Sequence, residues 1–214
     1  NGNLAPIMTR IDSTTKGEWQ PYYGPFYLKS KATVSAKLAF DSENTQYQSQ
    51  GYFFKIPNNW DITILSKYNP QYTAGGPGGI IDGIRGYIDW RKGGWQGYQG
   101  QDFTAIVDLK SLKNVSAVSL GCLQDTRSWI LMPTLVKIEV SEDGKHFKPA
   151  GSIENTIADS VLENIIHDYK VSFPAVTARY IKVIAKNYGI LPKWHQGAGG
   201  EAFIFTDEIN VECH

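Results

Sequence analysis

Short segments rich in β-branched and aromatic residues recur along this chain, and they constrain its fold more than any other feature. In residues 31–40 (KATVSAKLAF), the valine, leucine and phenylalanine share one parity, and polar residues alternate with them. This period of two is typical of a half-buried strand. Segments of the same kind lie at residues 7–11, 51–56, 60–65, 103–109, 115–123, 134–141, 169–173, 179–186 and 202–211. We therefore expect an all-β protein, in which only residues 152–166 show a weak helix-like pattern.

The segment Pro57-Asn58-Asn59 interrupts the strand pattern, and we place a domain boundary after residue 58. This divides the 214 residues into a small β-sandwich domain, residues 1–58, and a larger domain, residues 59–214. Short strands separated by turn signals predict a sandwich or jelly roll for the larger domain.

Composition argues against several classes of function. The chain has 21 basic and 21 acidic residues, so its formal net charge is zero; a nucleic-acid binder normally carries a basic excess that offsets phosphate charge. The sequence contains no run of about 18 apolar residues that could cross a membrane. Two cysteines, Cys122 and Cys213, are too few for a metal cluster of the CxxC type. The pair is compatible with one disulfide or with two buried thiols.

The larger domain resembles the discoidin, or coagulation factor 5/8 type C, family of galactose-binding-like jelly rolls, which includes carbohydrate-binding modules of family 32. The resemblance lies in five pieces that follow one another in order: Asp82-Gly83, residues 103–109 (FTAIVDL), 135–144 (LVKIEVSEDG), 178–183 (ARYIKV) and 207–211 (DEINV). Together they cover roughly residues 60–212. The resemblance implies a jelly roll whose loops at one end hold a sugar.

Other segments are similar to the C-terminal region of bacterial family-20 β-hexosaminidases. These are residues 123–130 (LQDTRSWI) and 192–199 (PKWHQGAG), and residues 7–39 are similar to the small chitobiase-type β domain of the same enzymes. The chain starts at Asn1 without Met or an apolar leader, so we expect an excised or processed piece. The resemblance implies a non-catalytic fragment that binds a glycan, with the catalytic domain of the parent enzyme in cis. It also implies a secreted, periplasmic or bacterial cell-surface protein. The neutral charge argues against a nucleic-acid partner, and a membrane partner is not expected, because the loop aromatics are interleaved with Gln, Arg and His.

A sugar site needs an aromatic face that stacks on a pyranose ring and polar side chains that bond its hydroxyls. Loops that combine both kinds of residue are the best places to look for one. Three loops, at residues 92–99, 124–129 and 187–195, meet this condition. The predicted ligand-binding residues are Trp95, Tyr98, Gln124, Arg127, Trp129, Tyr188, Trp194 and His195. The alternatives are that each tryptophan packs beneath its own loop, that Arg127 pairs with Asp125, and that His195 caps a loop.

The family often carries a structural Ca²⁺, and the resemblance assigns Asp82 and Glu208 as its side-chain ligands. The family's hydroxyl ligand has no clear match here, and the alternative is that Asp82 caps a turn and Glu208 ends a strand. Asp207-Glu208 is not expected to be a catalytic pair, because neighbours on a strand point to opposite faces.

Two other functions stay open. One is a structural or protein- or cell-surface-interaction module, since a fold does not determine function. The other is a small enzyme built around Arg127, His195 and Asp207.

Overall fold

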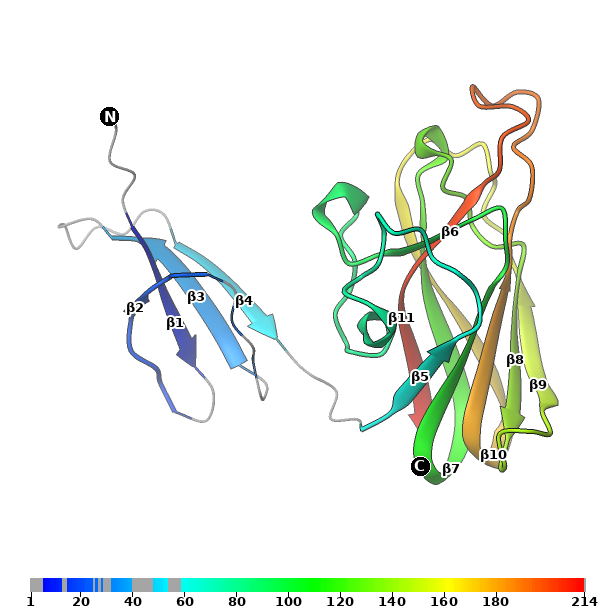
Figure 1. Ribbon diagram of the computed structural model, residues 1–214, viewed down its shortest axis with the longest axis horizontal. Coiled ribbons are helices and arrows are strands. Elements are labelled where there is room, and N and C mark those ends of the chain that lie inside the picture. The colour runs from blue at the N-terminus through cyan, green and yellow to red at the C-terminus, as the bar shows by residue number, and fades with distance from the viewer. Residues whose placement is uncertain are drawn as a thin grey trace. The chain divides into compact units, whose positions relative to one another are not determined.

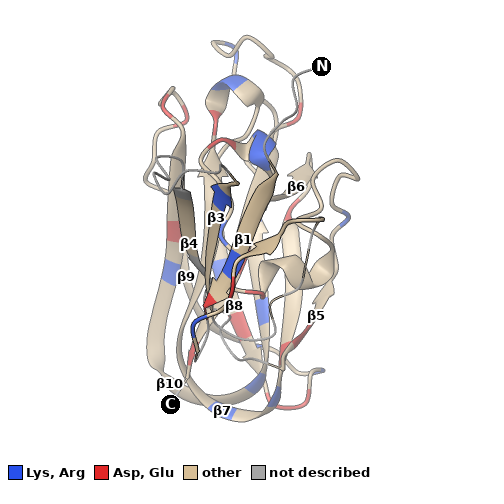
Figure 2. Cartoon of the chain, turned by 90° about the vertical axis from the view of Figure 1, so that its left-hand side faces the viewer, with Lys and Arg blue, Asp and Glu red and all other residues tan. Residues whose placement is uncertain are grey.

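The structure is a computed structural model that describes residues 6–12, 15–24, 26, 28, 32–39, 48–53 and 59–213. The chain divides into two compact units, Asn1–Ile56 and Pro57–His214. Figure 1 shows strands in both units. Basic and acidic residues are interspersed along the chain, and neither sign gathers in one stretch (Figure 2). Within the residues described, no helix is long and apolar enough to cross a membrane.

The described part of the first unit is a four-stranded antiparallel sheet with the order β2-β1-β3-β4. Its strands are β1 (Ile7–Asp12), β2 (Gln20–Pro21), β3 (Ala32–Leu38) and β4 (Gln48–Phe53). The alternating segment at residues 31–40 supplies β3, whereas Phe40 falls outside the described residues. Trp19 covers one face of this sheet, because the cations of Arg10 and Lys37 lie 4.9 and 4.6 Å from its ring centroid.

The second unit is a β-sandwich built on antiparallel strands, with the order β6-β11-β7-β10-β8-β9 and β5 paired to β7. The strands are β5 (Asp61–Ile64), β6 (Gln96–Gln99), β7 (Phe103–Gln124), β8 (Leu135–Ser141), β9 (Lys148–Glu154), β10 (Ile165–Lys186) and β11 (Phe203–Cys213). Short 3₁₀ turns lie between them: η1 (Pro77–Ile80), η2 (Trp90–Lys92) and η3 (Thr126–Ser128). The predicted all-β, jelly-roll class is confirmed.

Strands β7 and β10 each take part in both layers of the sandwich (Figure 1). The first half of β7 pairs with β5 and with the end of β10, and its second half pairs with β11 and with the start of β10. The sequence suggested two separate strands in each place. The pairing of β7 with β10 shifts register between Ser172 and Val176 and again between Ala178 and Tyr180, yet each strand continues through these positions.

The core lies between the layers and follows the alternation seen in the sequence. Phe103, Ala105, Val107 and Leu109 of β7 are all at most 1% exposed, whereas the residues between them are half-buried. Each fully buried side chain of this size contributes about 1.5–3 kcal/mol from removal of apolar surface from water. The core therefore holds the two layers together.

Two sequence-based expectations are resolved by the pairing. Residues 152–166 are not helical, since they are the end of β9, a loop and the start of β10. Cys122 and Cys213 are both free. Cys122 pairs with Thr206, while Cys213 pairs with Val115. Positions 115 and 122 of β7 are roughly 23 Å apart at about 3.3 Å per residue. That separation is far beyond the reach of a disulfide.

Candidate functional site

Four loops gather at one end of the second unit. They are the β7–β8 loop (residues 125–134), the β9–β10 loop (155–164), the β10–β11 loop (187–202) and part of the long β5–β6 loop (65–95). Three of them meet because β7 and β9 end at the same edge of the sandwich, β8 and β11 begin there, and β10 has both of its ends there (Figure 1). We call this set of loops the loop cluster.

Direct hydrogen bonds join the β7–β8 and β10–β11 loops. The Nε2 atom of His195 lies 2.6 Å from the carbonyl oxygen of Thr126, and the side-chain amide of Gln196 donates to the carbonyl oxygen of Arg127 at 2.8 Å. His195 also accepts from the backbone N–H of Gly197 through Nδ1, which places its own proton on Nε2. His195 is only 5% exposed, so it holds two loops together and does not face a ligand.

Trp129 also packs inside the loop cluster. A Cβ atom added to Gly197 or Gly200 would come within 2.4 or 2.7 Å of its ring, so only glycine fits at these two positions. The residue adopts a left-handed backbone conformation with φ 67, which ends η3. Its half-buried ring therefore supports the β10–β11 loop from below.

The β9–β10 loop is held by buried polar groups. The hydroxyl of Thr126 donates to the carbonyl oxygen of Val161 at 2.7 Å, and the Gln124 amide donates to that of Ala158 at 2.9 Å. Tyr188 donates its phenol proton to Asp159, and this hydrogen bond raises the pKa of Tyr188 to about 12. Gln124, at 0% exposure, and Tyr188 are thus loop anchors.

Trp194 and Arg127 are the predicted residues that the loop cluster presents to solvent. Trp194 is 51% exposed, and Arg127 is also exposed. Two hydrogen bonds join the loops that carry them. His195, next to Trp194, bonds the carbonyl oxygen of Thr126, and Gln196 bonds that of Arg127. The ring centroids of Trp194 and His195 lie 5.6 Å apart in an edge-to-face arrangement, which limits the freedom of the indole. An indole and a guanidinium on adjoining, braced loops can stack on a ring and donate several hydrogen bonds.

The structure buries Trp95 and Tyr98, two of the predicted contact residues. Trp95 is 2% exposed and donates its indole N–H to the carbonyl oxygen of Tyr87 at 2.8 Å. Tyr98 is fully buried and bonds the side chain of Gln96 at 2.6 Å, and burial raises the pKa of its phenol far above the usual range. Both rings lie beneath the β5–β6 loop, where their apolar surface is removed from water. For Trp95 this is the alternative given above, in which a tryptophan packs beneath its own loop.

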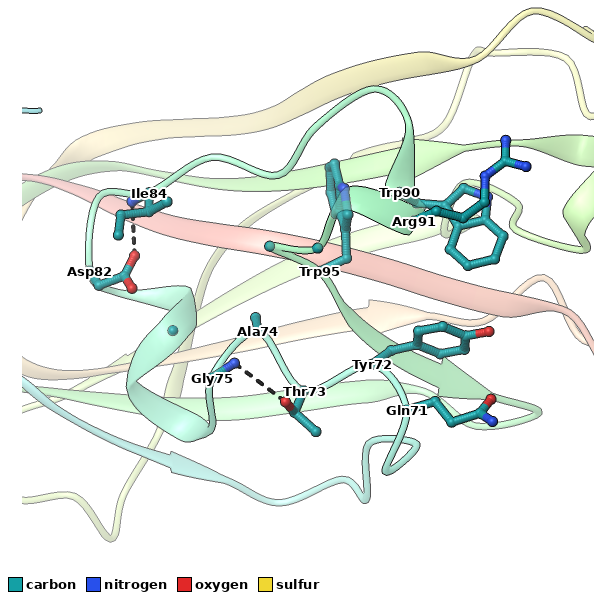
Figure 3. A pocket seen from close by; sticks show the side chains of 13 residues that line it. Gln71, Tyr72, Thr73, Ala74, Gly75, Asp82, Ile84, Trp90, Arg91 and Trp95 are labelled. Atoms are coloured by element: carbon teal, nitrogen blue, oxygen red, sulfur yellow. Dashed lines mark hydrogen bonds between the residues drawn. The ribbon is translucent and has the colours of Figure 1, made fainter. Parts of the chain in front are cut away.

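Beside the loop cluster, the β5–β6 loop folds back on itself and forms a cleft of about 490 Å³. Figure 3 looks into it, with Tyr72, Trp90 and Arg91 at one end and Asp82 at the other. The indole N–H of Trp90 donates to the carboxylate of Asp125 in the β7–β8 loop at 3.0 Å. Sequence reasoning missed Trp90 and its neighbours. The sequence signal that could have found them is the Trp90-Arg91 pair, which directly precedes the predicted site loop at residues 92–99.

The sequence of the second unit matches the F5/8 type C domain over residues 61–200, more than half of the chain. The chain belongs to this family.

Solved structures similar to this chain include CpGH89CBM32-5 from Clostridium perfringens in complex with GalNAc-β-1,3-galactose. That structure is 17% identical, with 72% of this chain and 94% of that chain covered and a TM-score of 0.42. The CBM32 of AlyQ in complex with 4,5-unsaturated mannuronic acid is 16% identical, with 71% and 93% covered and a TM-score of 0.46. A pectin-binding carbohydrate-binding module is 18% identical, with 71% and 88% covered and a TM-score of 0.44. A comparison with curated proteins finds no match.

In this F5/8 type C domain, the two predicted metal ligands lie close together. Glu208 is 2% exposed and accepts a hydrogen bond from the backbone N–H of Gly83 at 3.0 Å. Burial, with the nearby charges of Asp82 and Asp207, raises the pKa of Glu208 to about 8. Asp82 also accepts from the backbone N–H of Ile84 at 2.8 Å, as a turn cap does. Two neighbouring carboxylates whose charges act on each other suit a hard cation.

Asp207 and Glu208 do not diverge as neighbours on a regular strand would, because a β-bulge between Thr206 and Ile209 turns both toward the β5–β6 loop. Asp207 accepts from Arg85 Nε and from the backbone N–H of Gly86, each at 2.8 Å. The F5/8 type C domain thus uses Asp207 to anchor that loop, away from His195 and Arg127.

Proposed function

We propose that this chain is a non-catalytic carbohydrate-binding fragment that holds a sugar at its loop cluster. The observation that carries the proposal is that Trp194, with a half-exposed indole, and Arg127, also exposed, stand on two loops joined by hydrogen bonds. The flat indole face stacks on the C–H side of a pyranose, and the planar guanidinium bonds adjacent hydroxyls. Arginine is pre-organised for such contacts because its donors form a rigid fork.

The ligand we propose is a terminal galactose- or N-acetylhexosamine-type sugar, bound with a Kd of about 0.1 to several mM, or about −3 to −5 kcal/mol. We expect the binding to be weak because the site offers only one exposed aromatic ring and one exposed cation. The parent protein is a secreted, periplasmic or cell-surface glycoside hydrolase of the β-hexosaminidase or chitobiase type, with its catalytic domain in cis. The sequence segments at residues 123–130 and 192–199 support this context.

An NMR titration tests the proposal. Galactose, N-acetylgalactosamine, N-acetylglucosamine, glucose and mannose are added in turn to the labelled chain. We expect shifts at the Trp194 indole N–H and the Arg127 guanidinium for galactose or an N-acetylhexosamine. Trp194→Ala should raise about tenfold the sugar concentration that half-saturates the Arg127 shifts, whereas Ile190→Ala, which removes another exposed apolar side chain (59%) from the same loop, should leave it unchanged. A panel that moves no loop-cluster signal would rule out the sugar site.

Calcium belongs to the same proposal. Asp82 and Glu208 supply carboxylate oxygens, and backbone carbonyls complete the six to eight ligands that Ca²⁺ takes. Backbone ligands are needed because the described residues hold no cluster of three or more His, Cys, Asp or Glu side chains. Addition of Ca²⁺ should raise the unfolding midpoint of the chain but not of the Glu208→Gln variant. An equal rise in both would argue against this pair as ligands.

One observation favours a second candidate function, docking on a protein or cell surface. Ile84, Tyr87 and Ile88 of the β5–β6 loop are 57%, 60% and 49% exposed. Exposed apolar side chains close together in a chain segment are typical of interaction sites. Sedimentation with vesicles and with intact bacterial cells tests this function. The variant in which Ile84, Tyr87 and Ile88 are all replaced by serine should sediment less with them. If it sediments to the same extent as the unaltered chain, this function is excluded.

A further inference from the structure

The cleft beside the loop cluster is a built cavity, and its walls are pinned from within. Gln96 is fully buried, and its side-chain amide donates to the carbonyl oxygens of Thr73 at 3.1 Å and Gly76 at 2.6 Å. Tyr98 in turn donates its phenol proton to Gln96. The facing wall is held by the bond from the Trp95 indole to Tyr87. Because buried side chains already hold the walls of the cleft in place, these walls need no ordering when a ligand enters. The entropic cost of binding is therefore lower.

Trp90 connects this cleft with the loop cluster. Its ring lines one end of the cleft, next to Tyr72 at 5.6 Å, while its indole N–H bonds Asp125 in the β7–β8 loop. Arg127 lies two residues after Asp125, and Ser128 also bonds the Asp125 carboxylate at 2.8 Å. The same tryptophan is therefore a wall shared by the cleft and the loop that carries Arg127.

The lining of the cleft indicates which ligands fit. Glycines at 75, 79, 93 and 94 leave backbone exposed along both walls, so a bulky polar ring can approach the backbone closely. One cation, Arg91, and one anion, Asp82, lie at opposite ends (Figure 3). The opposite charges balance, which favours a neutral ligand over a sulfated or uronic-acid sugar. The volume of about 490 Å³ lies in the range of about 300–1,000 Å³ common for small-molecule sites.

We propose that this cleft is a second sugar subsite, and that the chain binds a neutral oligosaccharide whose terminal residue lies at Trp194 and whose next residues pass Trp90 into the cleft. This inference rests on the sugar site proposed at the loop cluster. Hydrogen-bonding side chains that line the cleft are Gln71, Thr73, Asp82 and Arg91, of which Gln71 and Arg91 are exposed, and Arg91 also donates from Nε to Asp89 at 2.8 Å. Its aromatic walls are Trp90 and Tyr72.

Isothermal titration with ligands of increasing length tests the subsite. The probes are galactose, a neutral galactose–N-acetylhexosamine disaccharide, and the tri- and tetrasaccharides that extend it. We expect the longer ligands to bind at least about tenfold more tightly than galactose, a difference easily resolved by titration. In NMR spectra, the longer ligands should shift the amides of Gly93 and Gly94, and galactose should leave both unchanged.

Variants separate the subsite from the primary site. Arg91→Ala and Ala74→Leu should each remove the gain from chain length and leave galactose binding intact, since Ala74 points into the cleft (Figure 3). Lys92→Ala is the matched control, because Lys92 is an exposed cation on the same turn but does not line the cleft. If Ala74→Leu unfolds the chain, Arg91→Ala still decides the question.

Three results would overturn the subsite, and they can be told apart. Equal affinities for all chain lengths, together with shifts at Trp194, would refute the cleft and leave the sugar site at the loop cluster standing. Absence of binding by every probe would refute both. A gain from length that survives Arg91→Ala and Ala74→Leu would place the additional sugar residues outside the cleft.

Discussion

Replacement of Trp194 by alanine should weaken sugar binding about tenfold and leave the fold unchanged. A tryptophan carries roughly 250 Å² of surface, and Trp194 is 51% exposed, so roughly 125 Å² faces solvent. A pyranose laid on one face covers about half of this, or roughly 60 Å². At about 25 cal/mol per Å² of buried apolar surface, the loss is about 1.5 kcal/mol. That corresponds to about a tenfold increase in Kd.

Isothermal titration with the best monosaccharide of the NMR panel measures this change, and circular dichroism checks the fold. Ile190→Ala, on the same loop, is the matched control and should keep the Kd of the unaltered chain. The unfolding midpoint of Trp194→Ala should stay within about 2 °C, because an exposed ring contributes little packing. A Kd within twofold of the unaltered chain would show that the indole face does not contact the sugar, and the reasoning from exposure would be wrong.

Three further outcomes follow from the buried groups. Because burial raises the pKa of Glu208 to about 8 from 4.5, its protonation stabilises the fold below about pH 4.5, and this stabilisation is lost as the pH rises through about 8. In chelator, the unfolding midpoint should therefore fall between pH 5 and pH 8, and Glu208→Gln should flatten that slope. Gly200→Ala should lose about 1–3 kcal/mol in urea unfolding, since the new methyl would lie 2.7 Å from the Trp129 ring. Gly78→Ala, with no atom within 4 Å of its Cβ, should lose less than about 1 kcal/mol. Dithiothreitol should leave the midpoint unchanged, because both cysteines are free.

The bulge at Asp207 and Glu208 shows how one backbone irregularity escapes sequence reasoning. A strand pattern assigns neighbours to opposite faces, and nothing in the residues 203–213 (FIFTDEINVEC) marks an extra residue. The ladder with β7 shifts register there, and both carboxylates then serve the β5–β6 loop. The bulge could not be predicted because it depends on the pairing partner, which the strand does not encode locally.

The loop tryptophans illustrate the same limit for the site. Trp95 and Trp194 both stand in loops among glycine, glutamine or histidine, and the sequence offered no reason to separate them. The structure buries Trp95 to 2% exposure and leaves Trp194 at 51%. The difference arises from what lies above each ring: Gly86 packs directly on Trp95, whereas Trp194 extends beyond the loops that His195 joins.

The all-β class, the family motifs and the alternation that builds the core can be read from residue order alone, because a period of two and a turn residue are local properties. Arg127 and Trp194 could be nominated in the same way, since their chemistry suits a sugar wherever they lie. Only the tertiary structure decides that these two face solvent, that Trp95 and Tyr98 brace the walls of a cleft, and that Trp90 joins this cleft to the loop cluster. The physical reason is that exposure and adjacency in loops are set by contacts between segments far apart in the sequence, such as that between Gly83 and Glu208, which no local pattern records.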